Sequence, residues 1–183
     1  SVPSTIVNKV CLSGLNAIMQ ADQLIQAGDA DIVVAGGMES MTNAPYLLPD
    51  ARAGMRLGDK AVLDSLMYDG LTCAIDHISM GLSTDRFGAA AGIRREDQDE
   101  FSAQSHERAA AAIKDGRFAD EIVPVPVPQR KGDPLLVDTD EGVRPGTTSE
   151  SLGGLRPSFD RNGTVTAGNA SQISDGASAV VVM

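Results

Sequence analysis

Three stretches of the chain are predicted to form helices. In the first, which follows Gly14, apolar residues recur three or four positions apart, at Leu15, Ile18, Met19, Ala21, Leu24 and Ile25. Gly28 then stands where a helix C-cap belongs. The other two helices are expected over residues 81–92 and 96–115. The second of these has acidic residues in its first turns and a lysine in its last, an order that complements the helix dipole. These residues are Glu96, Asp97, Asp99, Glu100 and Lys114.

Short apolar runs predict strands on either side of the first helix and near the C-terminal end. The runs cover residues 6–10, 32–35 and 179–183, and the last two have the pattern of buried strands, that at 32–35 being buried on both faces. A strand, a helix and a second strand in this order usually form a right-handed crossover with parallel strands in an α/β sheet. We therefore expect Cys11 where the C-terminal end of a strand meets a helix, an edge that ligands of α/β sheets favour.

The rest of the chain is predicted to be less regular. Residues 39–81 lack a clear period and contain scattered Gly, Pro, Asp and Met, which indicates an excursion from the sheet. Residues 122–128 alternate like a strand, but their three prolines confine them to an edge or an extended segment. Turn formers prevail over residues 132–163, and residues 164–171 enter a loop rich in Gly and Ser.

The composition excludes several classes of function. Fifteen Lys and Arg against twenty-five Asp and Glu leave a formal net charge of −10 over 183 residues, which argues against a nucleic-acid partner. Aromatic residues make up only 3% of the chain, so base-stacking surfaces are poorly supplied. The two cysteines, Cys11 and Cys73, give no disulfide framework, which fits a reducing compartment and disfavours a zinc site.

Targeting signals give a simple expectation for location. No apolar run approaches the length of a membrane span, and the first five residues lack the basic-then-apolar order of a signal peptide. We therefore expect a cytoplasmic protein of one domain, without a membrane partner. We also expect the chain to be part of a longer one, because it begins without Met and its last apolar run stops without a turn or cap.

Cys11 is the strongest candidate for chemistry. A thiol at a helix N-terminus lies near the positive end of the helix dipole and near unpaired backbone N–H groups, which favour the thiolate and can stabilise a developing oxyanion. Ser13 and Gly14 support this interpretation, because a tight Cys-x-Ser-Gly turn lets backbone come close to a substrate. The alternative is that Cys11 is a small buried hydrophobe, as free cysteines commonly are.

The other reactive side chains favour structural interpretations. Cys73 lies in the irregular excursion and is expected to be inert, and His106, on a charged helix face, is expected to be solvated. Whether His77 reaches Cys11 is left open, because a nucleophile and its base are neighbours in space rather than in sequence. No metal site is predicted, since the acidic clusters lack metal-ligand spacing and fit a solvated surface. They consist of Asp29, Asp31, Asp138, Asp140 and Glu141.

Three long motifs occur in a fixed order along the chain. They are Val7-Asn8-Lys9-Val10-Cys11-Leu12-Ser13-Gly14, then Val34-Ala35-Gly36-Gly37-Met38-Glu39-Ser40-Met41, and finally Thr166-Ala167-Gly168-Asn169-Ala170-Ser171 with Ser174-Asp175-Gly176-Ala177. Together they resemble the thiolases, the acetyl-CoA acetyltransferases. The resemblance runs over essentially all 183 residues, including segments 115–118 and 120–124 between the motifs.

The resemblance implies a layered α/β fold of the thiolase type. Such a core is built from two similar halves, with an irregular loop domain inserted in the first half. Residues 1–42 would be part of the N-terminal core with the nucleophile, residues 43–163 the loop domain and coenzyme A-binding insert, and residues 164–183 the return to the core. The C-terminal thiolase domain would be absent from these 183 residues.

The family pattern also implies roles for individual residues. Cys11 would be the catalytic nucleophile that attacks an acyl-CoA thioester, with its own backbone N–H in the oxyanion hole. A second acyl-CoA, deprotonated at its α-carbon, would then attack the acyl-cysteine to form a 3-ketoacyl-CoA such as acetoacetyl-CoA, and the reverse reaction would cleave one. The residues that would bind coenzyme A are Leu71, Met80, Arg144, Ser151, Phe159, Ala167, Ala170, Ser171 and Ile173.

These assignments have a physical logic. The small residues of the loop at 167–171 leave room for pantetheine beside the backbone, Phe159 and Met80 can supply apolar walls, and Arg144 suits the charged nucleotide end. For Phe159, Leu71 and Met80 the alternative is an ordinary loop-domain core. The implied partner is acyl-CoA or coenzyme A as substrate, with no further cofactor and no metal. The resemblance further implies a homodimer or homotetramer when the chain is complete, and a place in fatty-acid metabolism.

The sequence departs from the family pattern in two places. Short-chain, biosynthetic relatives often carry a His immediately before the position of Met80, where this chain has Ser79. The family's acid–base groups lie in a Gly-His-Pro segment, in a Cys-x-Gly-Gly segment and at an Asn that positions a water, and we expect these outside the present residues or on another chain. Two alternatives follow: a truncated thiolase-like protein that binds coenzyme A or oligomerises without turnover, and a ketoacyl synthase of the same superfamily, which the motif at 8–14 disfavours.

Overall fold

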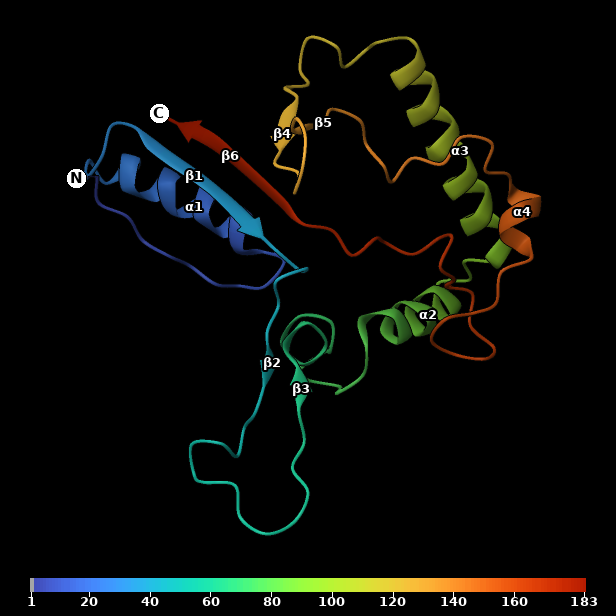
Figure 1. The fold of residues 1–183 in the computed structure, drawn as a ribbon, viewed down its shortest axis with the longest axis horizontal. Coiled ribbons are helices and arrows are strands. Elements are labelled where there is room, and N and C mark those ends of the chain that lie inside the picture. The colour runs from blue at the N-terminus through green and yellow to red at the C-terminus, as the bar shows by residue number, and fades with distance from the viewer. Residues whose placement is uncertain (1) are drawn as a thin grey trace. The chain divides into compact units, whose positions relative to one another are not determined.

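Contacts within the chain divide it into two units. The structure is a computed structural model and describes residues 2–183. Unit 1 contains the chain up to His77 together with Ile173–Met183, and unit 2 contains Ile78–Gln172 (Figure 1). The expected division at 42/43 and 163/164 into core and loop domain stays a prediction.

Unit 1 is built around one helix and one pair of strands. Helix α1 spans Ser13–Gln26, strand β1 spans Val33–Glu39 and strand β6 spans Gly176–Val182. The two strands pair antiparallel over their full length, from Val33 opposite Val182 to Glu39 opposite Gly176. Helix α1 packs along this pair, mainly against β1 (Figure 1).

Small residues allow α1 to approach β1 closely. Ala21 of α1 and Ala35 of β1 are buried, with 1% and 4% of their surface exposed. A Cβ on Gly37 would lie 3.3 Å from the Cα of Gly14, tighter than most contacts between side chains and backbone. Gly37 therefore serves helix–strand packing, because a side chain at this position of β1 would press against the start of α1, whereas a Cβ on Gly14 would make only ordinary contact at 3.8 Å.

The predicted parallel pair of strands is wrong. Residues 6–10 form no strand, and β1 pairs instead with β6, which follows in the sequence more than a hundred residues later. Val10 has a φ of 51°, a left-handed conformation that cannot continue a strand. The backbone N–H groups of Lys9 and Val10 donate to the side chains of Ser13 and Asn8, so these groups are not free for a sheet ladder.

The expected burial of β1 and β6 is also wrong within the described residues. Helix α1 covers only one face of the pair, which leaves Val34 71% exposed on the other face. Along β6 only Val182 is even half-buried. The positions of both strands were predicted correctly, since hydrophobic runs mark strands, but the run does not show what covers each face.

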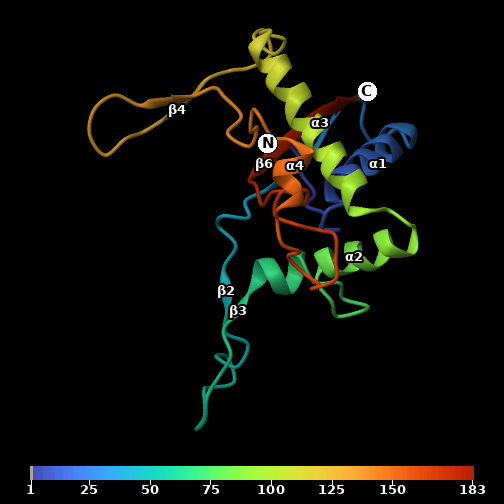
Figure 2. The same cartoon turned by 90° about the vertical axis from the view of Figure 1, so that its right-hand side faces the viewer.

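The excursion after β1 is irregular, as predicted. It contains the two-residue antiparallel strands β2, Tyr46–Leu47, and β3, Leu63–Asp64, which lie side by side in Figures 1 and 2. A π-helix at Leu66–Gly70 follows directly, and the amide of Leu66 donates to the carboxylate of Asp64. The long segment between β2 and β3 forms no helix or strand.

Asp175 fastens the end of β1 to the approach to β6. Its carboxylate accepts hydrogen bonds from the backbone N–H of Thr42 at 2.9 Å and from the hydroxyl of Ser40 at 3.1 Å. The hydrogen bond from Thr42 is the main reason that the pKa of Asp175 is lowered from its ordinary value. Two motifs that lie far apart in the sequence are thus joined by one carboxylate.

Unit 2 consists mainly of helices. Helix α2 spans Met80–Ala90, α3 spans Arg95–Lys114 and the short α4 spans Ser149–Gly153. Helix α4 lies against α3 in both views (Figures 1 and 2). Strands β4, Val125–Val127, and β5, Leu135–Val137, form a two-stranded antiparallel hairpin, which confirms the edge position expected from the prolines.

The predicted helix ends are confirmed. Gly28, Gly92 and Gly116 follow α1, α2 and α3 with φ angles of 79°, 69° and 67°. After α1, the amide of Gly28 donates to the carbonyl of Ile25 and the amide of Asp29 donates to that of Leu24, and the same pattern closes α2 and α3. This is the Schellman motif, in which glycine takes the left-handed conformation at no steric cost.

No helix within residues 2–183 is both long enough and apolar enough to cross a membrane.

We predict that the Asp175 clamp, which consists of the hydrogen bonds from Ser40 and Thr42 to its carboxylate, weakens in acid. The lowered pKa means that its contribution to stability is present above the ordinary carboxyl pKa of about 3.9 and is lost as the pH falls through the lower pKa of the folded state. In an NMR titration the Thr42 amide proton should shift with a midpoint below about 3.9, and the Asp175→Asn variant should abolish that shift. A midpoint at or above the ordinary value would contradict the clamp.

Candidate functional site

Cys11 lies directly before α1, as the sequence predicted. It is exposed, so the alternative of a buried structural cysteine is wrong within the described residues. Leu12 occupies the N-cap position of α1, and its side chain cannot accept a hydrogen bond from the first turn. The thiol therefore stands at a helix start that no side chain of the N-cap residue covers.

A compact turn presents Cys11. The hydroxyl of Ser13 donates to the carbonyl of Val10 and accepts from the amide of Lys9, both at 2.7 Å. The side chain of Asn8 accepts from the amide of Val10 at 3.0 Å. The predicted tight turn around Ser13 is thus present, and it uses the side chains of its own motif. The amides of Leu12 and Ser13 are already engaged by carbonyls of this turn, so they are not the unpaired N–H groups that the sequence suggested.

The remaining reactive side chains have separate surroundings. Cys73 is half-buried, and its sulfur accepts from the amide of Asp76 at 3.5 Å. His77 is exposed and has a left-handed φ of 54°. His106 is half-buried rather than fully solvated, and its Nδ1 accepts from the backbone N–H of Arg144 at 3.2 Å. Sequence reasoning missed this contact because it joins residues 38 positions apart.

Two of the candidate coenzyme A residues, Met80 and Phe159, lie next to the same glycine, Gly81, in unit 2. Phe159 packs against Gly81, where a Cβ would collide with the phenyl ring. Met80 precedes Gly81 and begins α2, with its N-cap Ser79 accepting from the amide of Leu82 at 3.2 Å. Met80 and Phe159 are 41% and 45% exposed, so both keep apolar surface open to a ligand.

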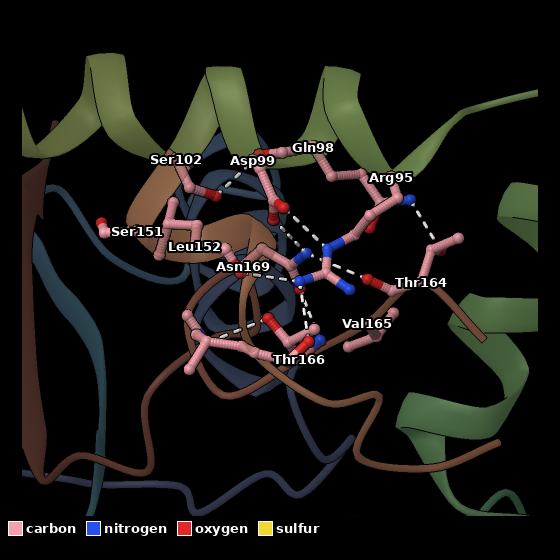
Figure 3. Close-up of polar contacts among 12 residues, drawn as sticks. Arg95, Gln98, Asp99, Ser102, Ser151, Leu152, Thr164, Val165, Thr166 and Asn169 are labelled. Atoms are coloured by element: carbon pink, nitrogen blue, oxygen red, sulfur yellow. Dashed lines mark hydrogen bonds and ion pairs between the residues drawn. The ribbon is translucent and has the colours of Figure 1, made fainter. Parts of the chain in front are cut away.

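The 164–171 loop carries Ala167, Ala170 and Ser171 and is held by polar side chains. Asp85 of α2 accepts from the backbone N–H groups of Thr164 and Val165 at 2.7 and 2.9 Å. From α3, Gln98 donates to the Thr164 hydroxyl at 2.8 Å, and Asp99 accepts from the side-chain amide of Asn169 at 3.0 Å (Figure 3). The loop is therefore anchored to two helices.

Asp99 and Asp85 are buried carboxylates, with 2% and 6% of their surface exposed. Arg95 neutralises Asp99 through an ion pair of 2.7 Å, and its guanidinium also donates to the carbonyls of Leu152 and Leu155 beside α4. From the sequence, Asp99 was predicted only to complement the helix dipole. The overlooked signal was Arg95 four residues earlier, on the same face of the helix.

Arg144 and Ser151 lie close to α3 and α4. Arg144 is exposed, and its carbonyl accepts from the hydroxyl of Thr147 at 2.8 Å. The hydroxyl of Ser151 donates to the carbonyl of Thr148 at 2.8 Å, and the Thr148 hydroxyl accepts from the amide of Ser151 at 3.1 Å. Ser151 thus has a capping role in α4 beside any role in binding.

The structure does not bring all candidate residues into one unit. Cys11, Leu71 and Ile173 belong to unit 1, whereas the other candidates belong to unit 2. Leu71 is half-buried and Ile173 is exposed. Within residues 2–183, no group of three or more His, Cys, Asp or Glu is placed to hold a metal ion.

Comparison with known proteins gives a consistent result. The sequence model of the family described as thiolase, N-terminal domain, matches residues 1–183. An acetyl-CoA acetyltransferase of Thiocystis violacea is 54% identical over 183 residues, which cover 100% of this chain and 46% of that protein. A probable acetyl-CoA acetyltransferase of Mycolicibacterium smegmatis is 56% identical over 182 residues, covering 100% of this chain and 47% of the relative.

The fold agrees with the sequence. A solved structure of acetyl-CoA acetyltransferase from Syntrophomonas wolfei superposes with a TM-score of 0.91 at 40% identity, covering 97% of this chain and 44% of that one. The chain belongs to the thiolase family and matches the N-terminal domain of that family. The predicted thiolase-like α/β fold is confirmed. The chain spans about half the length of the curated relatives it matches.

We predict that Gly163→Ala destabilises unit 2. A Cβ at Gly163 would collide with the carboxylate of Asp85, and moving that carboxylate would break its hydrogen bonds to the loop. The expected loss is about 1–3 kcal/mol, the cost of leaving buried polar groups unpaired. Chemical denaturation measures it. The matched control is Gly153→Ala in α4, where a Cβ meets nothing within 4 Å, and an equal loss in both variants would contradict the prediction.

Proposed function

We propose that this chain is part of a thiolase-type acyltransferase, which forms or cleaves 3-ketoacyl-CoA through an acyl group on Cys11. The observation that carries the proposal is the exposed thiol at the start of α1, presented by the thiolase-like motif in a chain that matches the thiolase N-terminal domain throughout. The names of the relatives, acetyl-CoA acetyltransferases, support acyl-CoA as the substrate class.

The proposed chemistry is transfer of an acyl group between two nucleophiles. The Cys11 thiolate attacks the thioester carbonyl, a new carbon–sulfur bond forms, and coenzyme A leaves as its thiolate. In the second step the α-carbon of another acyl-CoA loses a proton and attacks the acyl-cysteine, which returns the electron pair to the sulfur of Cys11. Each proton transfer needs a base within hydrogen-bond reach, and the family pattern places those bases in motifs that these residues do not contain.

Unit 2 supplies features suited to coenzyme A. Met80 and Phe159 present exposed apolar surface, and the exposed Ala167 and Ser171 belong to a loop without bulky side chains. Arg144 offers an exposed positive charge for the phosphates of the nucleotide end. We assign the same ligand to Ser151, Ala170, Leu71 and Ile173 by their places in the motif pattern.

We further propose that coenzyme A enters only as a substrate thioester, without another cofactor. A homodimer or homotetramer, a cytoplasmic location and a place in fatty-acid metabolism complete the proposal. They rest on the resemblance and, for the location, on the two unpaired cysteines.

We expect acetylation of Cys11 by acetyl-CoA. The natural chain that contains these residues is incubated briefly with acetyl-CoA, quenched in acid, and its intact mass and peptides are measured. The expected result is one acetyl group on the Cys11 peptide, lost in Cys11→Ser and kept in the matched control Cys73→Ser, because Cys11 is exposed whereas Cys73 is half-buried. Acetyl-CoA binding without an adduct would favour a coenzyme A-binding protein without turnover.

A further inference from the structure

The polar contacts of the 164–171 loop are concentrated on one side chain. The amide of Asn169 donates to the carboxylate of Asp99 and to the carbonyl of Thr164, each at 3.0 Å. Its oxygen accepts from the backbone N–H of Thr166 at 2.7 Å. Asn169 thereby closes the loop on itself and ties it to α3 (Figure 3).

The interior of the loop is as constrained as its anchors. Thr166 is fully buried, and its hydroxyl accepts from the amide of Gly168 at 3.2 Å. The carbonyl of Thr166 accepts from the amide of Ala170 at 3.0 Å. A Cβ on Gly168 would meet the side chains of Leu152 and Leu155, so the backbone lies directly on these leucines. The positions of Ala167 and Ala170 therefore follow from a fixed backbone.

The carboxylate of Asp85 anchors the loop at a second place and uses only one of its two oxygens. One oxygen accepts the amides of Thr164 and Val165, whereas the other, Oδ2, is buried and has no hydrogen-bond partner within residues 2–183. An unpaired buried oxygen is costly. The hydrogen bonds that Asp85 does make all go to the 164–171 loop, so this carboxylate serves the conformation of the loop.

We propose that Asp99, Asn169 and Asp85 are positioning residues for acyl-CoA, which set the backbone of the 164–171 loop along which pantetheine binds. The inference rests on the proposed function and extends it to side chains that need not touch the substrate. Loss of this network weakens binding of acyl-CoA, while the intrinsic reactivity of Cys11, which belongs to unit 1, is retained.

The test compares two identical substitutions on one helix. Asp99→Asn removes the charge that pairs with Arg95 and holds Asn169, whereas Asp97→Asn changes an exposed aspartate two residues away that pairs with Arg94. In the natural full-length chain we expect Asp99→Asn to raise KM for acetyl-CoA about tenfold or more, with kcat changed by less than about threefold. Asp97→Asn should leave both constants near the wild-type values.

A second readout separates positioning from a general loss of structure. Iodoacetamide alkylates Cys11 without needing the coenzyme A loop, so its rate should be equal in wild type and Asp99→Asn while acetylation by acetyl-CoA slows. The double variant Asp99→Asn with Asn169→Asp exchanges the amide and the carboxylate. It restores a hydrogen bond between the two positions but not the one from residue 169 to the carbonyl of Thr164, because a carboxylate cannot donate. It should recover part of the lost affinity, as coupled residues do in a double-mutant cycle.

The outcomes are distinguishable. If the Asp99→Asn variant does not fold, Gln98→Ala takes its place in the test, because it removes only the side-chain hydrogen bond to Thr164. It should raise KM for acetyl-CoA by about two- to tenfold. Equal KM values in wild type, Asp99→Asn and Gln98→Ala, or parallel losses of alkylation and acetylation, overturn the positioning role alone. A wild-type chain that neither binds coenzyme A nor becomes acetylated overturns the proposed function and this inference with it.

Discussion

The conformation of unit 2 depends on two buried carboxylates: Asp99, which an arginine neutralises, and Asp85, one oxygen of which accepts two backbone N–H groups. Burying a charge is costly unless it is paired and hydrogen-bonded. Asp99 meets this condition through Arg95 and Asn169, and the side chain of Asp99 is only 3% exposed. Because Arg95 also holds two carbonyls beside α4, the helices α3 and α4 and the 164–171 loop form one polar system. Removing any member leaves a charge or an amide without its partner.

Unit 1 is held at Cys11 by fewer and more local interactions. The thiol lies at a helix start, and the turn that carries it is held by the side chains of Asn8 and Ser13 from the same motif. The left-handed Val10 is a costly conformation for a β-branched residue, and such residues often occur at functional sites. The glycine contact between α1 and β1 then fixes this turn against the strand pair. The proposed nucleophile and the loop for its proposed substrate are thus held by separate sets of interactions, one local in sequence and the other between distant segments.

The sequence allowed accurate prediction where the cause is local. The three long helices follow from spacing and charge order, and Gly28 was predicted as a C-cap, because a left-handed C-cap is a property of a few adjacent residues. Gly92 and Gly116 close the other two helices in the same way. The place of Cys11 before a helix is local too. The partner of β1 was missed because pairing with β6 depends on contacts across more than a hundred residues. The network of Asp85, Asp99 and Asn169 was missed for the same reason. Charged residues on helices are usually solvated, and only contacts with distant segments bury these two aspartates.

In the proposed reaction an acyl group passes from coenzyme A to Cys11 while the 164–171 loop holds the pantetheine. The most direct measurement is a crystal structure of the natural full-length chain after a soak with acetyl-CoA. We expect an acetyl group bonded to the sulfur of Cys11, and coenzyme A with its pantetheine along Ala167, Ala170 and Ser171. An unmodified Cys11 with coenzyme A bound at another surface would contradict the proposed reaction.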